Sequence, residues 1–579
     1  MKEKTHLVRN RCLFSIVVIL VYFLCHRIPL NGIDMSEYNN AGLDLGAILT
    51  MAVSGAGQKC YVMSLGISPY ITASLLISIL FAMRSKEARA RTSPKAMNYW
   101  ITGVCFVVAL AQSIFYALSL KYVEKDLMSI LVVIFELMAG ASIAQYLLIN
   151  NKKYGVGGFA PIIIVNMTEF EGYRYVDGGV CAAQGFQANG LNCGLNPDKN
   201  KNDLGMVFSK EPCETAAVYT QNKVKGAPIR VTKKHLAAGN GVTHAILVNS
   251  KNANTGNADG EKVAAETSKL AAEALGIDEA QVVVASTGVI GQLMPVAPFA
   301  DHMKALVDGL SESGHEKAAT AIMTTDTVRK EVAVEFEIDG KKCCLGGMAK
   351  GSGMIHPNMA TTLNFITSDV AISHQMIQKA LDEIVKITYN CLSIDGDTST
   401  NDMVSVMANG LAGNATISTE EAEGFAVFKQ ALYIVMMNMT RMLAKDGEGA
   451  TKLLECSCKG APDQETAIIV AKSVIRSPLF KCAMFGEDAN WGRVLCAIGY
   501  ADADFAIDTM DVDLSSTAGT LEVCRNGAGI DFSEEFAAKV LAEDEIYIDI
   551  DLKQGDGSAK AWGCDLTYDY VKINGDYRS

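Results

Sequence analysis

The chain has 579 residues and a formal net charge of −13 at pH 7. At roughly 100–200 residues per domain, this length predicts about three or four folding units. The acidic balance argues against general nucleic-acid binding, because phosphate needs a basic face. The 16 cysteines are scattered, and the close pairs, Cys343 with Cys344 and Cys456 with Cys458, lack zinc spacing. We therefore predict reduced cytosolic thiols and no metal site.

Four apolar runs occupy the first part of the chain, at residues 12–29, 69–83, 99–120 and 127–149. The last two are long enough to cross a hydrocarbon core of about 30 Å, whereas the first two are marginal alone. No small-residue cleavage site follows the first run, which argues against a removable signal peptide. The sequence therefore predicts an all-α, four-helix transmembrane segment over residues 1–166.

The loops between these runs alternate in charge. Basic residues precede the first run and follow the second and fourth, while the other two loops carry little net positive charge. By the positive-inside rule, the N-terminus and everything after Lys152 lie on the cytoplasmic side of a multi-pass segment. Glu136 falls within the fourth run, where a carboxyl group indicates either a functional site or a contact between helices.

A resemblance rests on the segment GISPYITASLLISIL at residues 66–80, with PLNGID before it and NNKKYGVGG after it. These residues resemble the N-terminal part of a SecY-type translocon subunit over about residues 1–160. That family has two pseudo-symmetric halves of spanning helices with a channel between them. The runs seen here correspond to only part of such a structure, which cannot enclose a pore.

From Met167 onward the sequence changes character, and no run is long enough to span a membrane. Strand-like stretches at residues 245–250 and 281–287 lie on either side of a helical stretch at residues 261–276, whose apolar residues recur on one face. Strands that alternate with helices in this way predict an α/β fold.

The stretch KGSGMIHPNMATTLNFITSD at residues 350–369 fits no helical or strand period in its first half. Thr361 precedes an apolar run, so its plain structural interpretation is a helix N-cap. The catalytic alternative needs Thr361 to be the first residue of a chain, where its own α-amine activates the hydroxyl as a nucleophile. That state is reached only if the bond between Ala360 and Thr361 is cut, for example through an N-to-O acyl shift. The residues of this stretch alone permit both interpretations.

Other motifs follow in order along the same part of the chain. They are GGVCAAQGFQANGL, VASTGVIG, AIMTTDT, GGMAKGSGMI, IDGDTSTND, DGEGATK, FGEDANWGRVL and a terminal NGDYRS. With the stretch around Thr361, they closely resemble the ornithine acetyltransferase (ArgJ) family over about residues 167–579. The resemblance implies self-cleavage between Ala360 and Thr361. The products are an α fragment at residues 167–360 and a β fragment at residues 361–579 that begins with the nucleophile.

The resemblance also implies a role for each matched position. Thr361 is the catalytic nucleophile, and Thr287 and Gly288 form the oxyanion hole that holds the tetrahedral oxygen. The implied substrate contacts are Thr324, Lys350, Thr361, Glu448, Asn574 and Ser579. Without the resemblance, Thr287 and Gly288 would be a strand-to-turn pair, and Lys350 and Glu448 would be ordinary surface residues.

The implied activity is that of a glutamate N-acetyltransferase, which works by a ping-pong mechanism through an acetyl-threonine. Thr361 takes the acetyl group from N-acetylornithine, ornithine leaves, and glutamate receives the group, which serves arginine biosynthesis. No cofactor is required. Acetyl-CoA is a further donor in some members, so the sequence leaves monofunctional and bifunctional use open. The implied fold is a two-domain, layered αββα architecture, whose α and β fragments associate as (αβ)₂ or a larger cytoplasmic assembly.

Lys251 departs from the family pattern, because VNSKNANTG has Lys where we expect Gly. If this position has a positive φ, the Lys costs about 1 kcal/mol or more. The Asp-rich runs at residues 394–402 and 485–495 lack calcium-loop spacing, so we predict structural turns near the site. His356 is not placed where the family needs a base, and we predict a structural role for it.

Three interpretations of the whole chain remain open. The first is an acetyltransferase held at a membrane through residues 1–150. The second is a protein-translocation component with a fused enzyme, which the incomplete membrane segment argues against. The third is the joined product of two neighbouring reading frames, with Met167 as a natural start. The complete set of motifs after Met167 favours the third as an origin.

Overall fold

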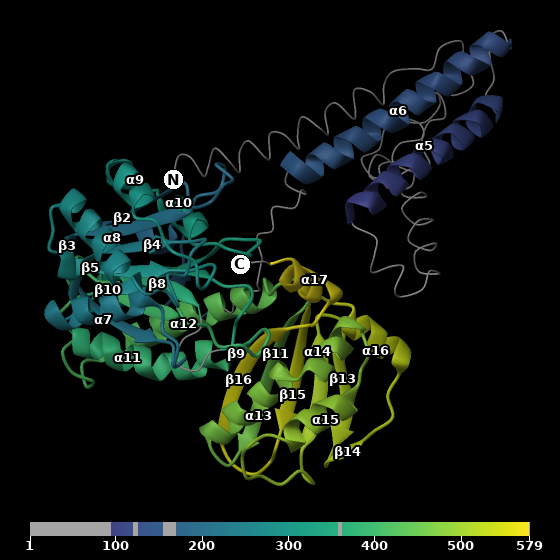
Figure 1. The fold of residues 1–579 in the computed structure, drawn as a ribbon. Coiled ribbons are helices and arrows are strands. Elements are labelled where there is room, and N and C mark those ends of the chain that lie inside the picture. Colours follow the sequence, from purple (N-terminus) through teal and green to yellow (C-terminus); the bar gives the residue numbers. More distant parts are fainter. Residues whose placement is uncertain (1–93, 120–125, 155–169, 357–361, 578–579) are drawn as a thin grey trace. The chain divides into compact units, whose positions relative to one another are not determined.

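The computed structural model describes residues 94–119, 126–154, 170–356 and 362–577 (Figure 1). The chain divides into two units, Met1–Ile162 and Ile163–Ser579. The apolar runs at residues 12–29 and 69–83 lie outside the described residues, and so do Ala360, Thr361 and Ser579.

Two packed helices, α5 (Pro94–Ser119) and α6 (Leu127–Tyr154), form the described part of the first unit. Residues four apart lie on the same face of a helix, and the buried side chains of both helices follow this spacing. These buried residues are Cys105, Ala109, Ser113 and Ala117 on α5, and Val133, Leu137 and Ala141 on α6. The buried side chains of each helix therefore fall on one face, and the two helices contact each other.

The helical prediction for the third and fourth runs is confirmed, but the prediction that they span a membrane is not supported. Throughout the described ranges, no helix is both long and apolar enough to cross a bilayer. Polar residues interrupt both helices, with Gln112 and Ser113 on α5 and Glu136 on α6.

The second unit contains two mixed β-sheets. Nine strands form the first sheet, in the order β1-β6-β7-β8-β10-β3-β4-β5, and β2 pairs with β3. The strands are β1 (Arg174–Tyr175), β2 (Phe186–Leu191), β3 (Leu204–Tyr219), β4 (Val242–Asn249), β5 (Val282–Ser286), β6 (Lys330–Ile338), β7 (Lys341–Lys350), β8 (Leu363–Ser368) and β10 (Met403–Ala408). Strands β8 and β10 are parallel, with Leu363 opposite Met403.

Helices pack against this first sheet (Figure 1). They are α7 (Ala227–Ala238), α8 (Gly260–Leu275), α9 (Ala297–Asp308), α10 (His315–Ala321), α11 (His374–Ile387) and α12 (Glu423–Lys445), with short 3₁₀ turns η2 (Gly179–Cys181), η3 (Glu279–Gln281) and η4 (Tyr389–Cys391). Helix α12 contacts β6 and β7 of this sheet and also β11 and β16 of the second sheet. Its side chains are almost all buried from Phe428 onward, so α12 joins the cores of the two sheets.

Seven strands form the second sheet, in the order β14-β13-β12-β15-β11-β16-β9. They are β9 (Leu392–Ser393), β11 (Leu453–Ala461), β12 (Asp511–Ser516), β13 (Gly519–Arg525), β14 (Ala528–Gly529), β15 (Glu545–Asp551) and β16 (Gly557–Cys564). The helices around it are α13 (Gln464–Arg476), α14 (Pro478–Phe485), α15 (Trp491–Gly499), α16 (Glu534–Leu541) and α17 (Tyr568–Asp576). Arg441 of α12 pairs with Glu455 of β11 at 3.0 Å and with Glu545 of β15 at 3.1 Å. These ion pairs fix the helix to the second sheet.

The sequence predicted the elements around β4 closely. The strands expected at residues 245–250 and 281–287 are β4 and β5, and the helix expected at residues 261–276 is α8. Helix α8 ends where Gly276 adopts a left-handed φ of 70°, a common way to stop a helix. The α/β class is thus confirmed, while the finer αββα layering stays a prediction.

The fragment boundary predicted at residues 360 and 361 does not separate the two sheets. Strands β8 and β10 follow this point in the chain, yet they lie in the first sheet between β7 and β3. Backbone pairing runs from Lys350 opposite Leu363 to Leu345 opposite Ser368 on one side. Both predicted fragments therefore build the first sheet together.

Candidate active site

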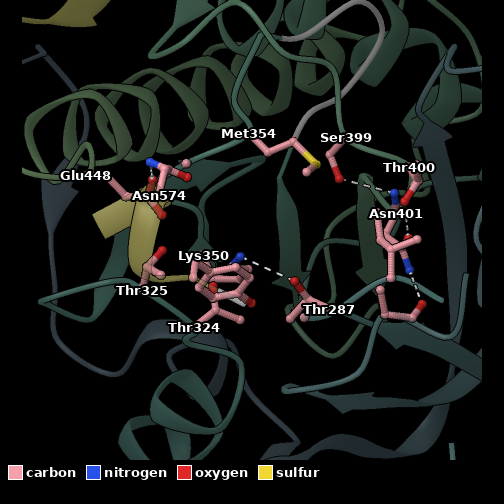
Figure 2. A pocket seen from close by; sticks show the side chains of 15 residues that line it. Thr287, Thr324, Thr325, Lys350, Met354, Ser399, Thr400, Asn401, Glu448 and Asn574 are labelled. Carbon is pink, nitrogen blue, oxygen red and sulfur yellow. Dashed lines mark hydrogen bonds between the residues drawn. The ribbon is translucent and has the colours of Figure 1, made fainter. Parts of the chain in front are cut away.

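A pocket of about 130 Å³ gathers the described members of the predicted site (Figure 2). Its walls come from the end of β5, the loop before β6, the end of β7, the segment before β10, the turn after α12, and helix α17. Six residues that the sequence assigned to the site line it: Thr287, Gly288, Thr324, Lys350, Glu448 and Asn574. Residues from both predicted fragments are needed to enclose this space.

Thr287 and Gly288 begin the turn that leaves β5. The backbone N–H of Thr287 donates to the carbonyl of Asn249 at 2.9 Å, so the donor that Thr287 can offer to a ligand is its hydroxyl. Gly288 has a φ of 131°, and a Cβ there would lie 2.2 Å from the carbonyl carbon of Lys251. Because backbone cannot yield as a flexible side chain can, this position requires glycine.

Lys251 has a φ of 74°, which confirms that this position lies in the left-handed region. Its carbonyl accepts a hydrogen bond from the N–H of Val289 at 3.0 Å, just past Gly288. The departure from the family pattern thus falls on the loop that packs against Gly288, one of the two predicted oxyanion-hole residues. The unfavourable φ of Lys251 therefore lies in the loop that contacts Gly288 and Val289.

Lys350 ends β7 with its side chain inside the pocket, where it is only 8% exposed. Its Nζ donates to Oγ1 of Thr287 at 3.3 Å (Figure 2). Burial lowers the pKa of Lys350 and the Lys330 charge adds to this, while Asp326, Asp402 and Glu448 oppose it. A buried ammonium that faces a cavity is well suited to pair with a ligand carboxylate. The surface interpretation of Lys350 is therefore wrong.

An ion cluster behind the pocket holds the loops that carry these residues. Lys330 is fully buried, and its Nζ lies 2.6 Å from Oδ1 of Asp326 and 2.6 Å from Oδ2 of Asp446. The other oxygen of Asp326 accepts from the N–H of Thr324 at 3.0 Å, and Oδ1 accepts from the N–H of Gly351 at 2.7 Å. We call Asp326, Lys330 and Asp446 the buried ion triad.

Charge pairing within the triad, rather than burial, sets the direction in which the pKa values of Asp326 and Lys330 move. Burial by itself would raise the pKa of Asp326, but the charges of Lys330 and Lys350 hold this pKa below its usual range. Burial would likewise lower the pKa of Lys330, but the two carboxylates raise it. Asp446 also accepts from the N–H of Thr327 at 3.0 Å and from its hydroxyl. The triad therefore fixes Thr324 and the residue after Lys350 relative to the end of α12.

Glu448 lies in the turn after α12 and is buried, unlike the exposed residue that its sequence context alone suggested. Its backbone N–H donates to the carbonyl of Ser352 at 2.9 Å, and its Oε2 accepts from Nδ2 of Asn574 at 2.6 Å. Asn574 belongs to α17, so this helix contributes to the lining of the pocket. Figure 2 shows the Glu448 and Asn574 side chains together at one edge.

Comparison with known proteins then decides the family. The ArgJ family model matches residues 187–579. The arginine biosynthesis bifunctional protein ArgJ 1 of Clostridium acetobutylicum is 47% identical over 396 residues, which is 68% of this chain and 96% of the relative. The chain belongs to the ArgJ family. The ArgJ protein of Caldanaerobacter subterraneus subsp. tengcongensis is 45% identical over 405 residues, which is 70% of this chain and 99% of the relative.

Two solved structures are also similar in sequence. The ArgJ protein of Bacillus halodurans is 45% identical and covers 37% of this chain and 98% of its own, with a TM-score of 0.35. The ornithine acetyltransferase of Mycobacterium tuberculosis, solved with ornithine, is 34% identical and covers 32% of this chain and 100% of its own, with a TM-score of 0.30. A SecY model matches residues 61–171, so the second predicted resemblance has support over that range alone.

The pocket also contains residues that the family resemblance did not single out. Ser399, Thr400 and Asn401 line it, within the run at residues 394–402 that we expected to be a structural turn. The signal in the sequence was a polar stretch placed directly before an apolar strand. The other such run, residues 485–495, spans the end of α14 and the start of α15, and contributes nothing to the described lining of the pocket.

His356 lies against Ser393, with its Nδ1 at 3.0 Å from the Ser393 hydroxyl. Burial lowers the pKa of His356 to about 4, and the charges of Lys472 and Arg476 contribute. A neutral, partly buried imidazole beside a neighbouring hydroxyl is compatible with the structural role that we predicted, which stays a prediction.

A second hollow of about 30 Å³ adjoins the pocket and shares Thr287, Lys350 and Ser399 with it. Thr362 and Asp402 line this hollow from the starts of the parallel strands β8 and β10. The N–H of Met403 donates to the carbonyl of Thr362 at 3.0 Å, which holds the two strand ends side by side. The Thr362 hydroxyl accepts a hydrogen bond from the side chain of Asn364.

Proposed function

We propose that this chain is a glutamate N-acetyltransferase of arginine biosynthesis that moves acetyl from N-acetylornithine to glutamate. The observation that carries the proposal is that six residues assigned from sequence alone surround one pocket, although they are spread from Thr287 to Asn574. Membership of the ArgJ family favours this function over a translocation component.

The proposed nucleophile is Thr361, freed by cleavage after Ala360. Thr361 is bonded to Thr362, which lines the hollow that opens beside Thr287 and Lys350. As the hydroxyl of Thr361 attacks the acetyl carbonyl, the C–N bond of N-acetylornithine breaks, ornithine leaves as the free amine, and the acetyl group stays on the hydroxyl oxygen. Glutamate then takes the acetyl group by the reverse steps.

Each residue that the sequence assigned to substrate binding or to the oxyanion hole has a chemical task in this proposal. The Thr287 hydroxyl and the Gly288 N–H stabilise the oxyanion, a contribution of about 3–4 kcal/mol for one such donor. Lys350 pairs with the substrate α-carboxylate, which both ornithine and glutamate possess. Glu448, oriented by Asn574, receives the side-chain amine of ornithine, while Thr324 and Ser579 complete the substrate contacts.

Cleavage is tested by the intact mass of the denatured full chain beside a Thr361→Ala variant. We expect the wild type to yield a fragment that begins at Thr361, and the variant to stay whole. Acetyl transfer from N-acetylornithine to glutamate is then measured on both proteins. If the wild type stays whole and transfers no acetyl group, Thr361 is not the nucleophile and the proposed mechanism is wrong.

The wider proposals concern assembly, donor and location. We propose that the fragments adopt the layered αββα arrangement, associate as (αβ)₂ or larger, and act in the cytoplasm on small-molecule substrates. Acetyl-CoA is proposed as a co-substrate, which an assay with acetyl-CoA and glutamate alone would test. Membrane fractionation distinguishes the origins of residues 1–166: a tethered enzyme leaves its α fragment in the pellet, whereas separate frames give a soluble fragment that begins at Met167.

A further inference from the structure

Asp395 holds the backbone of the segment that ends at one wall of the pocket. It is partly buried and lies in the run at residues 394–402. Its Oδ2 accepts a hydrogen bond from the N–H of Met354 at 2.6 Å, and its Oδ1 accepts one from the N–H of Ile355 at 2.9 Å. Met354 lines the pocket with a φ of 57°, which is uncommon for a residue other than glycine. The Asp395 carboxylate therefore stabilises an unfavourable backbone conformation beside the pocket.

Asp395 also contacts helix α17, which carries Asn574. The Tyr570 hydroxyl donates a hydrogen bond to the Asp395 carboxylate. Burial raises the pKa of Tyr570, and the charge of Asp395 raises it further, so the hydroxyl keeps the proton that it donates. No residue of α17 is buried, so the position of this helix depends on a few specific contacts such as this one.

Both parts of the chain that Asp395 holds touch Glu448. A Cβ on Gly353, at the start of the first part, would lie 2.3 Å from Oε2 of Glu448, so this backbone packs directly against the carboxylate. Asn574 lies one helical turn after the tyrosine, and its Nδ2 donates to the same oxygen at 2.6 Å. A shift of either part would therefore move the Glu448 carboxylate.

We propose that Asp395 is a positioning residue for the amine subsite, by which we mean the part of the pocket around Glu448. It holds residues 353–355 and α17 against Glu448, so that this carboxylate faces the side-chain amine of N-acetylornithine. The inference rests on the proposed function and adds to it the group that orients Glu448. Asp395 itself does not belong to the described lining of the pocket or of the hollow, so it acts through Glu448.

The two substrates should differ in their dependence on Asp395. N-acetylornithine has a free side-chain amine, whereas glutamate has a carboxylate at that end and gains nothing from Glu448. In a ping-pong reaction, kcat/KM for the acetyl donor reports only the first half-reaction, and kcat/KM for the acceptor reports only the second. The ratio of the two constants does not depend on how much of the protein is folded, so it separates positioning from a loss of structure.

The test compares Asp395→Asn with Asp397→Asn, which removes an exposed carboxylate from the same loop. Both variants lose one negative charge, but only in Asp395→Asn does an amide nitrogen, which cannot accept, replace an oxygen that holds the pocket wall. We expect Asp395→Asn to lower kcat/KM for N-acetylornithine by about 10-fold, the scale of one weakened hydrogen bond to a charged group. The constant for glutamate should stay within about 2-fold, because glutamate does not use that bond.

Tyr570→Phe is the second variant, since it removes the hydroxyl that contacts Asp395 and changes no charge. It should lower kcat/KM for N-acetylornithine relative to glutamate in the same direction, whereas the ratio for Asp397→Asn should match that of the wild type.

Several results would overturn the inference. They are an Asp395→Asn variant with an unchanged ratio of the two constants, a folded Asp395→Asn variant that stays whole by intact mass, and an Asp397→Asn variant with the same change in ratio. If Asp395→Asn does not fold, Tyr570→Phe decides, and an unchanged ratio there contradicts the inference. A wild type that transfers no acetyl group from N-acetylornithine to glutamate would instead refute the proposed function.

Discussion

Replacing Lys330 by Met removes the cation that lies between Asp326 and Asp446. Both carboxylates remain buried, and each loses an ion pair of 2.6 Å. Removing one partner of a buried ion pair costs about 3–5 kcal/mol, because the remaining charge stays buried without a counter-charge. We expect Lys330→Met to lower the free energy of unfolding of the full chain by this amount at pH 7.5, measured by urea and the fluorescence of the buried Trp562.

The pH dependence gives this prediction a second check. The pKa of Asp326 is lowered in the folded chain, so its contribution to stability is present above the unfolded pKa and is lost as pH falls through the folded value. The pKa of Lys330 is raised, so its contribution is present below the unfolded pKa and is lost at high pH. The cost of Lys330→Met should therefore shrink toward pH 4, where the unpaired carboxylates can take up protons.

A matched variant separates charge from packing. The triple change Asp326→Asn, Lys330→Met and Asp446→Asn leaves no charge within the triad, and we expect it to cost less than Lys330→Met alone, because replacing a whole buried ion cluster is often nearly neutral. The reasoning would be refuted if the single change cost under about 1 kcal/mol, or if the triple change cost more than the single one.

Further predictions concern the pocket. Lys251→Gly should raise the free energy of unfolding by about 1 kcal/mol in the same urea assay, because the φ of 74° at this position suits glycine. An unchanged free energy of unfolding would contradict the idea that Lys251 is strained. Gly288→Ala should abolish most acetyl transfer, since its Cβ would meet the Lys251 backbone, and Lys251→Gly should not rescue it. Burial lowers the pKa of Lys350, so this ammonium loses its proton at a lower pH than an ordinary lysine does. KM should therefore begin to rise at that lower pH, and Lys350→Met should remove this alkaline rise in KM. The exposed Lys269→Met serves as the control, and an alkaline limb that persists in Lys350→Met would contradict the carboxylate contact.

Sequence patterns predicted the local elements because local periodicity decides them. Alternation and a buried face identified β4, β5 and α8, and the motifs identified six of the residues that line the pocket. The buried ion triad could not be predicted, because Lys330 and Asp446 are 116 residues apart and meet only through packing of α12 on β6. Lys350 and Glu448 looked like surface residues for the same reason, since burial depends on chain segments that are distant in sequence.

The fold explains how the two predicted fragments could stay together after the predicted cut. The predicted cut lies ahead of β8, yet β8 pairs with β7 on one side and with β10 on the other, and β10 pairs with β3. Backbone hydrogen bonds across β7 and β8, and across β10 and β3, therefore hold the predicted fragments together independently of the bond that is cut. The triad adds a buried charge contact across the same division, with Asp326 and Lys330 before the cut and Asp446 after it. The predicted cleavage therefore breaks one backbone bond, while these contacts continue to support the walls of the pocket.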